Sequence, residues 1–185
     1  MSLDLQPEPE SASVASTPLA YEDLRPGANW TSPEREISGD DVAEFAVLTG
    51  DDDPLHTDPS APSPFGQPVA HGLLGLSVMA GLSVDYPRVA TLALVEIRGW
   101  SFSQPIFFGD RVRVRTTVES ITPHGRRAGR VVWRRELVNQ DDRIVQSGQI
   151  VTLVSRQRPS GRSHAASIRS SQNGGPIRRS SMPPR

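Results

Sequence analysis

HGLLGLSVMAGLSV, residues 71–84, is a long apolar run around which the rest of the chain has to pack. Apolar residues fall on nearly every side of a helix drawn through it, and a helix with that profile is buried on most of its surface. The run is too short to span a membrane. The segments around it must therefore supply a protein layer that covers this helix.

The sequence after this helix predicts strands and no second helix. Alternating or apolar runs bounded by turn residues indicate strands at 91–98, 101–108, 111–121, 129–138 and 143–154. Pro105 indicates a bulge or a sheet edge. Val112, Val114, Thr116 and Val118 fall on one face of their strand. One long helix followed by strands argues an α+β fold, and a curved antiparallel sheet wrapped around the helix, the hotdog arrangement, is one candidate.

The sequence before the helix predicts a shorter helix and then a loop. Residues 38–49 have Ser38 or Asp40 available as a cap and an apolar stripe on one face. Gly50 suits the left-handed conformation that ends many helices. Residues 51–68 contain five prolines and little periodicity, so we expect a loop.

The chain divides into a body and two tails by composition. Residues 1–25 are acidic and rich in Pro and Ser, whereas residues 156–185 carry seven Arg and no acid. Both lack the apolar content that offsets chain-ordering entropy, so we expect disordered tails around a single domain at 26–155. The basic tail could contact nucleic acid or anionic lipid. A solvated extension is favoured, because no aromatic residue is interleaved with these arginines.

Composition excludes several kinds of chemistry. The chain has no Cys, so it has no disulfide, thiol nucleophile or thiolate metal site. Its basic residues other than His are all Arg, which excludes Schiff-base or general-base lysine. No run reaches transmembrane length and no signal pattern opens the sequence, so a cytoplasmic protein without membrane partners is expected.

The loop TGDDDPLHTD, residues 49–58, concentrates acids beside a histidine. Asp51 follows Gly50, and His56 lies five residues on, beyond the rigid Pro54. A carboxylate and an imidazole could share one water and divide the acid and base roles. Two alternatives remain: a solvated acidic turn, and a metal site built from four ligands, namely Asp51, Asp53, His56 and Asp58.

His71-Gly72 opens the buried helix. Main-chain N–H groups at a helix start are unpaired and lie in a positive field, so they could stabilise an oxygen that gains negative charge. Gly72 has no side chain and would let a ligand approach closely. The alternative is a plain junction between a loop and a helix.

FAVLTGDDDPLHTDPSAPSPFGQPVAHGLL, residues 45–74, and PIFFGDRVRV, residues 105–114, together resemble the MaoC-like (R)-specific enoyl-thioester hydratases and dehydratases. The resemblance implies a hotdog domain that reversibly adds water to a trans-2-enoyl thioester of CoA or a carrier protein, giving the (R)-3-hydroxyacyl thioester. Asp51 and His56 match the catalytic pair, and Gly72 matches the residue whose N–H binds the thioester oxygen. It also implies a homodimer, a possible acyl carrier protein partner, a place in fatty acid or polyketide metabolism, and neither metal nor redox cofactor.

Asp53 departs from the family, which usually has Asn there. The extra charge is expected to tune the loop by favouring the protonated forms of Asp51 and His56. Three alternatives stay open beside the hydratase: a hotdog thioesterase, a non-catalytic acyl-thioester-binding subunit, and a tailoring dehydratase of a polyketide-type pathway.

Overall fold

The computed structural model describes residues 17–157. In chain order its elements are η1 (Tyr21–Asp23), β1 (Asn29–Thr31), β2 (Arg35–Glu36), α1 (Gly39–Thr49), α2 (Pro54–Thr57), α3 (Gly72–Leu82), β3 (Thr91–Phe102), β4 (Arg111–His124), β5 (Ala128–Val138) and β6 (Ile144–Ser155). The expected helices and most of the expected strands are present. The short β1, β2 and α2 are additions, because segments of two to four residues carry too little periodicity to predict.

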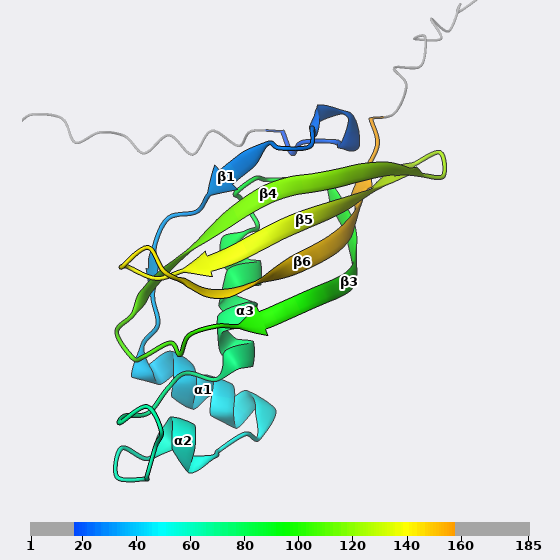
Figure 1. Cartoon of the computed structure of the whole chain (residues 1–185). Coiled ribbons are helices and arrows are strands. Elements are labelled where there is room, and N and C mark those ends of the chain that lie inside the picture. The colour runs from blue at the N-terminus through cyan, green and yellow to red at the C-terminus, as the bar shows by residue number, and fades with distance from the viewer. Residues whose placement is uncertain (1–16, 158–185) are drawn as a thin grey trace, which may run out of the picture.

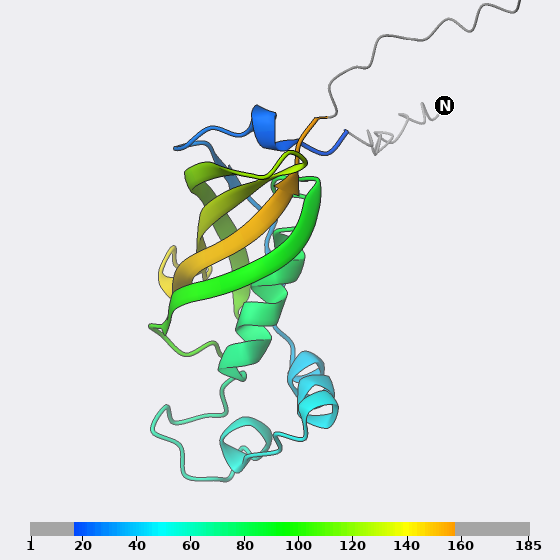
Figure 2. The ribbon, with the colours of Figure 1, turned by 90° about the vertical axis from the view of Figure 1, so that its right-hand side faces the viewer.

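An antiparallel sheet curls over one side of α3 (Figures 1 and 2). Its strand order is β1-β4-β5-β6-β3, with β2 paired to β4, so β3 lies at an edge. The helices α1 and α2 gather beyond the sheet, at the end where α3 begins. This α+β arrangement confirms the expected hotdog fold.

The core lies between α3 and the inner face of the sheet. Four residues of β4 predicted to share a face are all buried there: Val112, Val114, Thr116 and Val118. The sheet covers only one side of α3, however, and Leu73 on another side is 60% exposed. In a single chain, part of the apolar surface of α3 therefore lies outside the cover of the sheet.

The strand predicted at 101–108 is only partly correct. β3 continues to Phe102 and then the chain leaves the sheet, although Ser103 N still donates to Val145 O at 2.8 Å. Pro105 has no N–H to contribute to a ladder. A turn follows in which Phe107 N donates to the Asp110 carboxylate at 2.8 Å. This departure brings residues 103–107 beside the start of α3.

The domain extends beyond both predicted boundaries. Tyr21 and Leu24, which were assigned to the N-terminal tail, are buried against the core. At the other end Arg156 donates to Glu22 at 2.7 Å, and this hydrogen bond holds the pKa of Glu22 below its usual value. The prediction of disordered tails is wrong for these segments. It was based on average composition, which does not reveal two buried apolar side chains or a single ion pair. Residues 1–16 and 158–185 lie outside the described residues.

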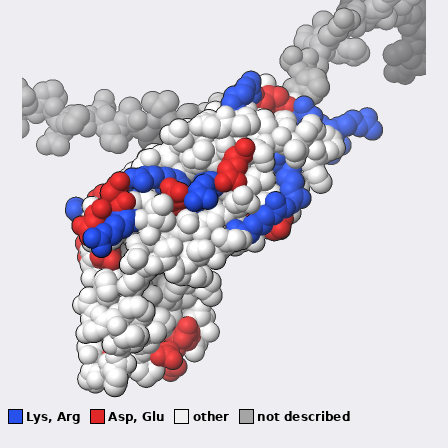
Figure 3. Space-filling view, in the orientation of Figure 1, with Lys and Arg blue, Asp and Glu red and all other residues white. Residues whose placement is uncertain are grey.

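Charged side chains of both signs gather on the outer face of the sheet (Figure 3). They form ion pairs there, for example Arg113 and Arg115 with Asp142, and Arg98 and Arg130 with Glu96. Exposed pairs of this kind contribute little to stability individually. Within residues 17–157, none of the helices has the length and apolar character needed to cross a membrane.

Candidate active site

The end of α1 sets the start of the acidic loop. Ser38 caps the beginning of the helix, since its hydroxyl accepts from Asp41 N at 3.1 Å. The helix ends at Gly50, which has φ 75° and ψ 13°, the left-handed conformation that glycine adopts without strain. Asp51 follows at once, with its side chain 54% exposed. The predicted helix and its glycine stop are both confirmed.

The loop contains a short helix, α2, that positions His56. Asp53 caps it by accepting from Leu55 N at 2.8 Å, and Pro54 occupies its first position. His56 Nδ1 lies 2.7 Å from Val69 O. Because a carbonyl can only accept, Nδ1 carries the proton in this contact. In the neutral ring Nε2 is then a free acceptor, which is the state a general base requires.

His71 is a site residue that the sequence reasoning passed over in favour of Gly72. It is buried, and its Nε2 donates to the main-chain oxygen of Asp51 at 2.9 Å. Its ring lies against that of His56, with centroids 3.9 Å apart and planes 31° apart. The signal was the histidine directly before the glycine of the helix start. His71 thereby ties the acidic loop to the first turn of α3.

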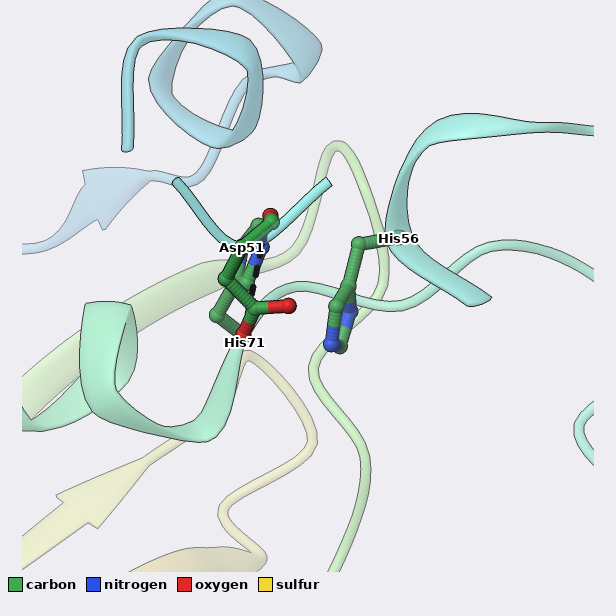
Figure 4. Close-up of side chains that lie close together, drawn as sticks. All are labelled: Asp51, His56 and His71. Atoms are coloured by element: carbon green, nitrogen blue, oxygen red, sulfur yellow. Dashed lines mark hydrogen bonds and ion pairs between the residues drawn. The ribbon is translucent and has the colours of Figure 1, made fainter. Parts of the chain in front are cut away.

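The structure brings Asp51, His56 and His71 together (Figure 4). Each offers one ligand atom, and these atoms lie within 4.8 Å of one another. The carboxylate of Asp51 points toward the ring of His56 in this view. These three could hold a metal ion by donor type, or hold one water between an acid and an imidazole.

The alternative of a metal site with four ligands is wrong, because two of the four residues do not reach the site. The carboxylate of Asp53 is used as the cap of α2. That of Asp58 accepts from the hydroxyl and N–H of Ser60, and these hydrogen bonds hold the pKa of Asp58 below its usual value. Only Asp51 and His56 of the proposed set converge.

The first turn of α3 faces this loop with its N–H groups open. The N-cap residue, His71, makes no side-chain capping hydrogen bond. Gly72 is exposed, and a Cβ there would lie 3.0 Å from the ring of Phe102. A cavity of about 270 Å³ adjoins these atoms and is lined by His56, Val69, Gly72, Phe102, Pro105 and Gln146, among others. The site thus places an imidazole, a carboxylate and free amides beside one cavity.

Gln146, which the sequence analysis did not single out, fixes the position of this helix start. It is buried, and its Nε2 donates to Gly72 O at 3.0 Å while its Oε1 accepts from Trp100 Nε1 at 3.3 Å. A Cβ on Gly75 would lie 2.3 Å from Gln146 Nε2, so the helix approaches this closely only because residue 75 is glycine. Gln146 is spatially adjacent but 74 residues from Gly72 in sequence, so no local pattern could reveal it.

The fold and the acid–histidine loop define a hotdog protein with a carboxylate and two histidines clustered at the start of its central helix. Residues 25–139 match the family model described as MaoC like domain, and the chain belongs to this family. Protein MaoC of Klebsiella aerogenes is 35% identical over 55% of this chain, which spans only 31% of that protein. The 3-hydroxybutyryl-CoA dehydratase of Methylorubrum extorquens is 34% identical over 60% of this chain and 70% of its own length.

Solved structures agree with this assignment. A MaoC-like dehydratase from Rhodospirillum rubrum superposes with a TM-score of 0.69 at 28% identity, over 76% of this chain and 99% of that one. A Mycobacterium tuberculosis protein described as a double hotdog fold has a TM-score of 0.65 at 22% identity, covering 76% of this chain and 45% of that one, and so supports the fold alone. Family members bear the names dehydratase and hydratase, which places enoyl-thioester hydration at the level of the family.

Proposed function

We propose that this protein reversibly hydrates a trans-2-enoyl thioester to the (R)-3-hydroxyacyl thioester. The observation that carries the proposal is the convergence of Asp51 and His56 beside the open N–H groups of α3. Acid, base and oxyanion donor are the three groups that this reaction needs. The names of the relatives support the same reaction class.

The catalytic pair would act on a single water. His56 Nε2, left unprotonated by the contact of Nδ1 with Val69, takes a proton while the water oxygen bonds to C3. The C2–C3 π electrons shift toward the thioester carbonyl, whose oxygen gains negative charge. The proton then passes to C2 through Asp51 and His56, so that H and OH of one water are added overall. No metal or redox group takes part in this scheme.

Gly72 would stabilise the intermediate. Its N–H belongs to the first turn of α3, where amides lack partners within the helix and the helix field favours negative charge. The hydrogen bond from Gln146 to Gly72 O fixes the plane of the peptide bond that follows Gly72. The enolate oxygen would therefore meet a donor that is already oriented, at no cost of reorganisation.

The protein would act as a homodimer, joined at the edge of the sheet. Strand β3 has no neighbour on its outer side within residues 17–157. Its exposed large apolar residues are Leu92, Leu94, Val95, Ile97 and Phe102. An uncovered edge with this composition is an association site. Sedimentation of the purified protein, with Leu92→Lys as the disrupting variant, tests this proposal.

The decisive experiment supplies crotonyl-CoA and follows two signals. Loss of the enoyl absorbance without release of free thiol supports a hydratase, whereas thiol release supports a thioesterase. Chiral analysis of the product tests the (R) configuration. The same assay with a crotonyl carrier protein decides between the two carriers, both of which fit a cytoplasmic role in fatty acid or polyketide metabolism. Absence of both signals with either carrier contradicts the proposal.

A further inference from the structure

A second cavity lies farther along α3, between the helix and the inner face of the sheet. Its volume is about 430 Å³. Most of its lining is apolar and includes Leu76, Met79, Leu94, Ile97, Trp133 and Ile150. The indole N–H of Trp133 is satisfied by Thr152 Oγ1 at 2.8 Å. Such walls suit the methylene groups of an acyl chain.

Arg135 introduces a charge into this apolar lining. It follows Trp133 at the next inward position of β5, where the flanking inward residues Trp133 and Leu137 are buried. Among the described residues its Nε is buried without a hydrogen-bond partner, and its NH1 lies 3.8 Å from the sulfur of Met79. No ion pair within residues 17–157 includes it. A buried polar atom without a partner calls for an explanation.

The preceding residue shows what an ordinary arginine does on this strand. Arg134 points to the outer face and donates to Glu136 at 3.1 Å. Burial lowers the pKa of Arg135 to about 10, so the side chain still carries its charge at neutral pH. The residue as a whole is half-buried, and Nε is its one nitrogen that is buried without a partner among the described residues. An anionic ligand would compensate that charge and would account for its presence.

The two cavities share one helix, which sets the distance between them. Met79 is seven residues beyond Gly72, so the contact of Arg135 lies about 10 Å along the helix from the amide of Gly72. An extended chain advances about 1.2 Å per bond, so about eight bonds would cover this distance. A medium-length acyl chain that runs along α3 from a thioester at Gly72 would therefore place its far end beside Arg135.

We propose that Arg135 binds a carboxylate at the distal end of the acyl chain, so that the preferred substrates are thioesters of dicarboxylic acids of medium length. This inference rests on the proposed function, because it takes the thioester to lie at Gly72. A guanidinium presents parallel N–H donors that match the two oxygens of a carboxylate. The apolar residues of the cavity would contact the methylene groups, and the guanidinium of Arg135 would bind the carboxylate at the end of the chain.

Binding of saturated thioesters tests the inference without any need for turnover. Hexanedioyl-, octanedioyl- and decanedioyl-CoA are each compared with the monocarboxylic thioester of equal length by titration calorimetry. For at least one length, we expect the wild type to bind the dicarboxylic form at least tenfold more tightly. Arg135→Met should abolish or reverse that preference, and Arg135→Lys should retain part of it.

Arg134→Met is the matched control, because it removes an arginine from the outer face of the same strand and should leave the preference unchanged. Equal affinities at every length in the wild type would overturn the inference, as would a preference that survives Arg135→Met or a failure of all these thioesters to bind. The crotonyl-CoA assay is read separately. If the dicarboxylic preference holds, the hydration assay is repeated with trans-2-octenedioyl-CoA. No loss of enoyl absorbance with that thioester would show that the proposed reaction is wrong while the carboxylate site stands.

Discussion

The starts of α1 and α3 use their first residues in opposite ways. At α1, Ser38 and Asp41 cap each other: the hydroxyl accepts from Asp41 N, and the carboxylate accepts from Ser38 N at 2.9 Å. At α3, His71 stands in the capping position but turns its ring to the main chain of Asp51. A helix start that satisfies its own amides stabilises the fold, whereas one left open beside a cavity is available to a ligand.

The largest expected effect comes from the groups that face the open helix start. Asp51→Asn and His56→Ala should each lower kcat by about 100-fold or more, the usual scale for general acid–base groups. Because both would act on one water, the double variant should lose little more than either single variant. Steady-state kinetics with an accepted enoyl thioester measures both effects.

Thermal unfolding is the control for this pair. Asp51 is exposed and His56 only half-buried, so neither substitution creates a cavity in the core and the midpoints should stay within a few degrees of the wild type. Activity like that of the wild type in either single variant would remove that residue from the mechanism.

A smaller effect is expected at His71, which would position the loop without touching the substrate. His71→Leu removes the hydrogen bond to Asp51 O and the contact with the ring of His56. A hydrogen bond of this kind is worth about 1 kcal/mol, so kcat should fall by roughly five- to tenfold. KM should change less than kcat. A fall in thermal midpoint with unchanged kcat would show that His71 serves only the fold.

Ser38→Ala should have the opposite effect to His71→Leu: the protein should lose stability while kcat stays unchanged. Removing a cap of this type costs about 1 kcal/mol in the free energy of unfolding. Burial acts to raise the pKa of Asp41, but hydrogen bonds from Ser38 and the charge of Arg35 together outweigh it and hold that pKa below its usual value. Stability from this carboxylate is present above that value and is lost as pH falls through the lowered pKa. The difference in the free energy of unfolding between the wild type and the variant, measured by urea unfolding, should therefore be smaller at acidic pH.

The smallest effect is expected from Asp53→Asn. The structure places this side chain at the exposed cap of α2, where the oxygen of an asparagine can accept from Leu55 N equally well. Its charge is exposed to solvent and screened. Stability should change by less than about 0.5 kcal/mol, and kcat should rise by no more than about twofold. A larger rise, with a basic limb that begins at lower pH, would show that the charge acts on His56 after all.

Local patterns sufficed for the parts of the molecule that are long and periodic. The helices α1 and α3, the glycine stop at Gly50 and the buried face of β4 all follow from spacing and capping residues. The clustering of Asp51 with His56 was predictable because five residues separate them. Gln146 was not, since its contact with Gly72 exists only after the sheet has formed. Alternation along β5 does place Arg135 inward, but only the structure shows that no acid of residues 17–157 pairs with it.

The hydrogen bond from His71 to Asp51 has an evolutionary consequence. It ends on the main-chain oxygen of Asp51, so it can persist whatever side chain residue 51 carries. The geometry of the loop and the identity of the acid are therefore separable under mutation. A descendant could exchange the acid, lose the reaction and still inherit an intact binding site.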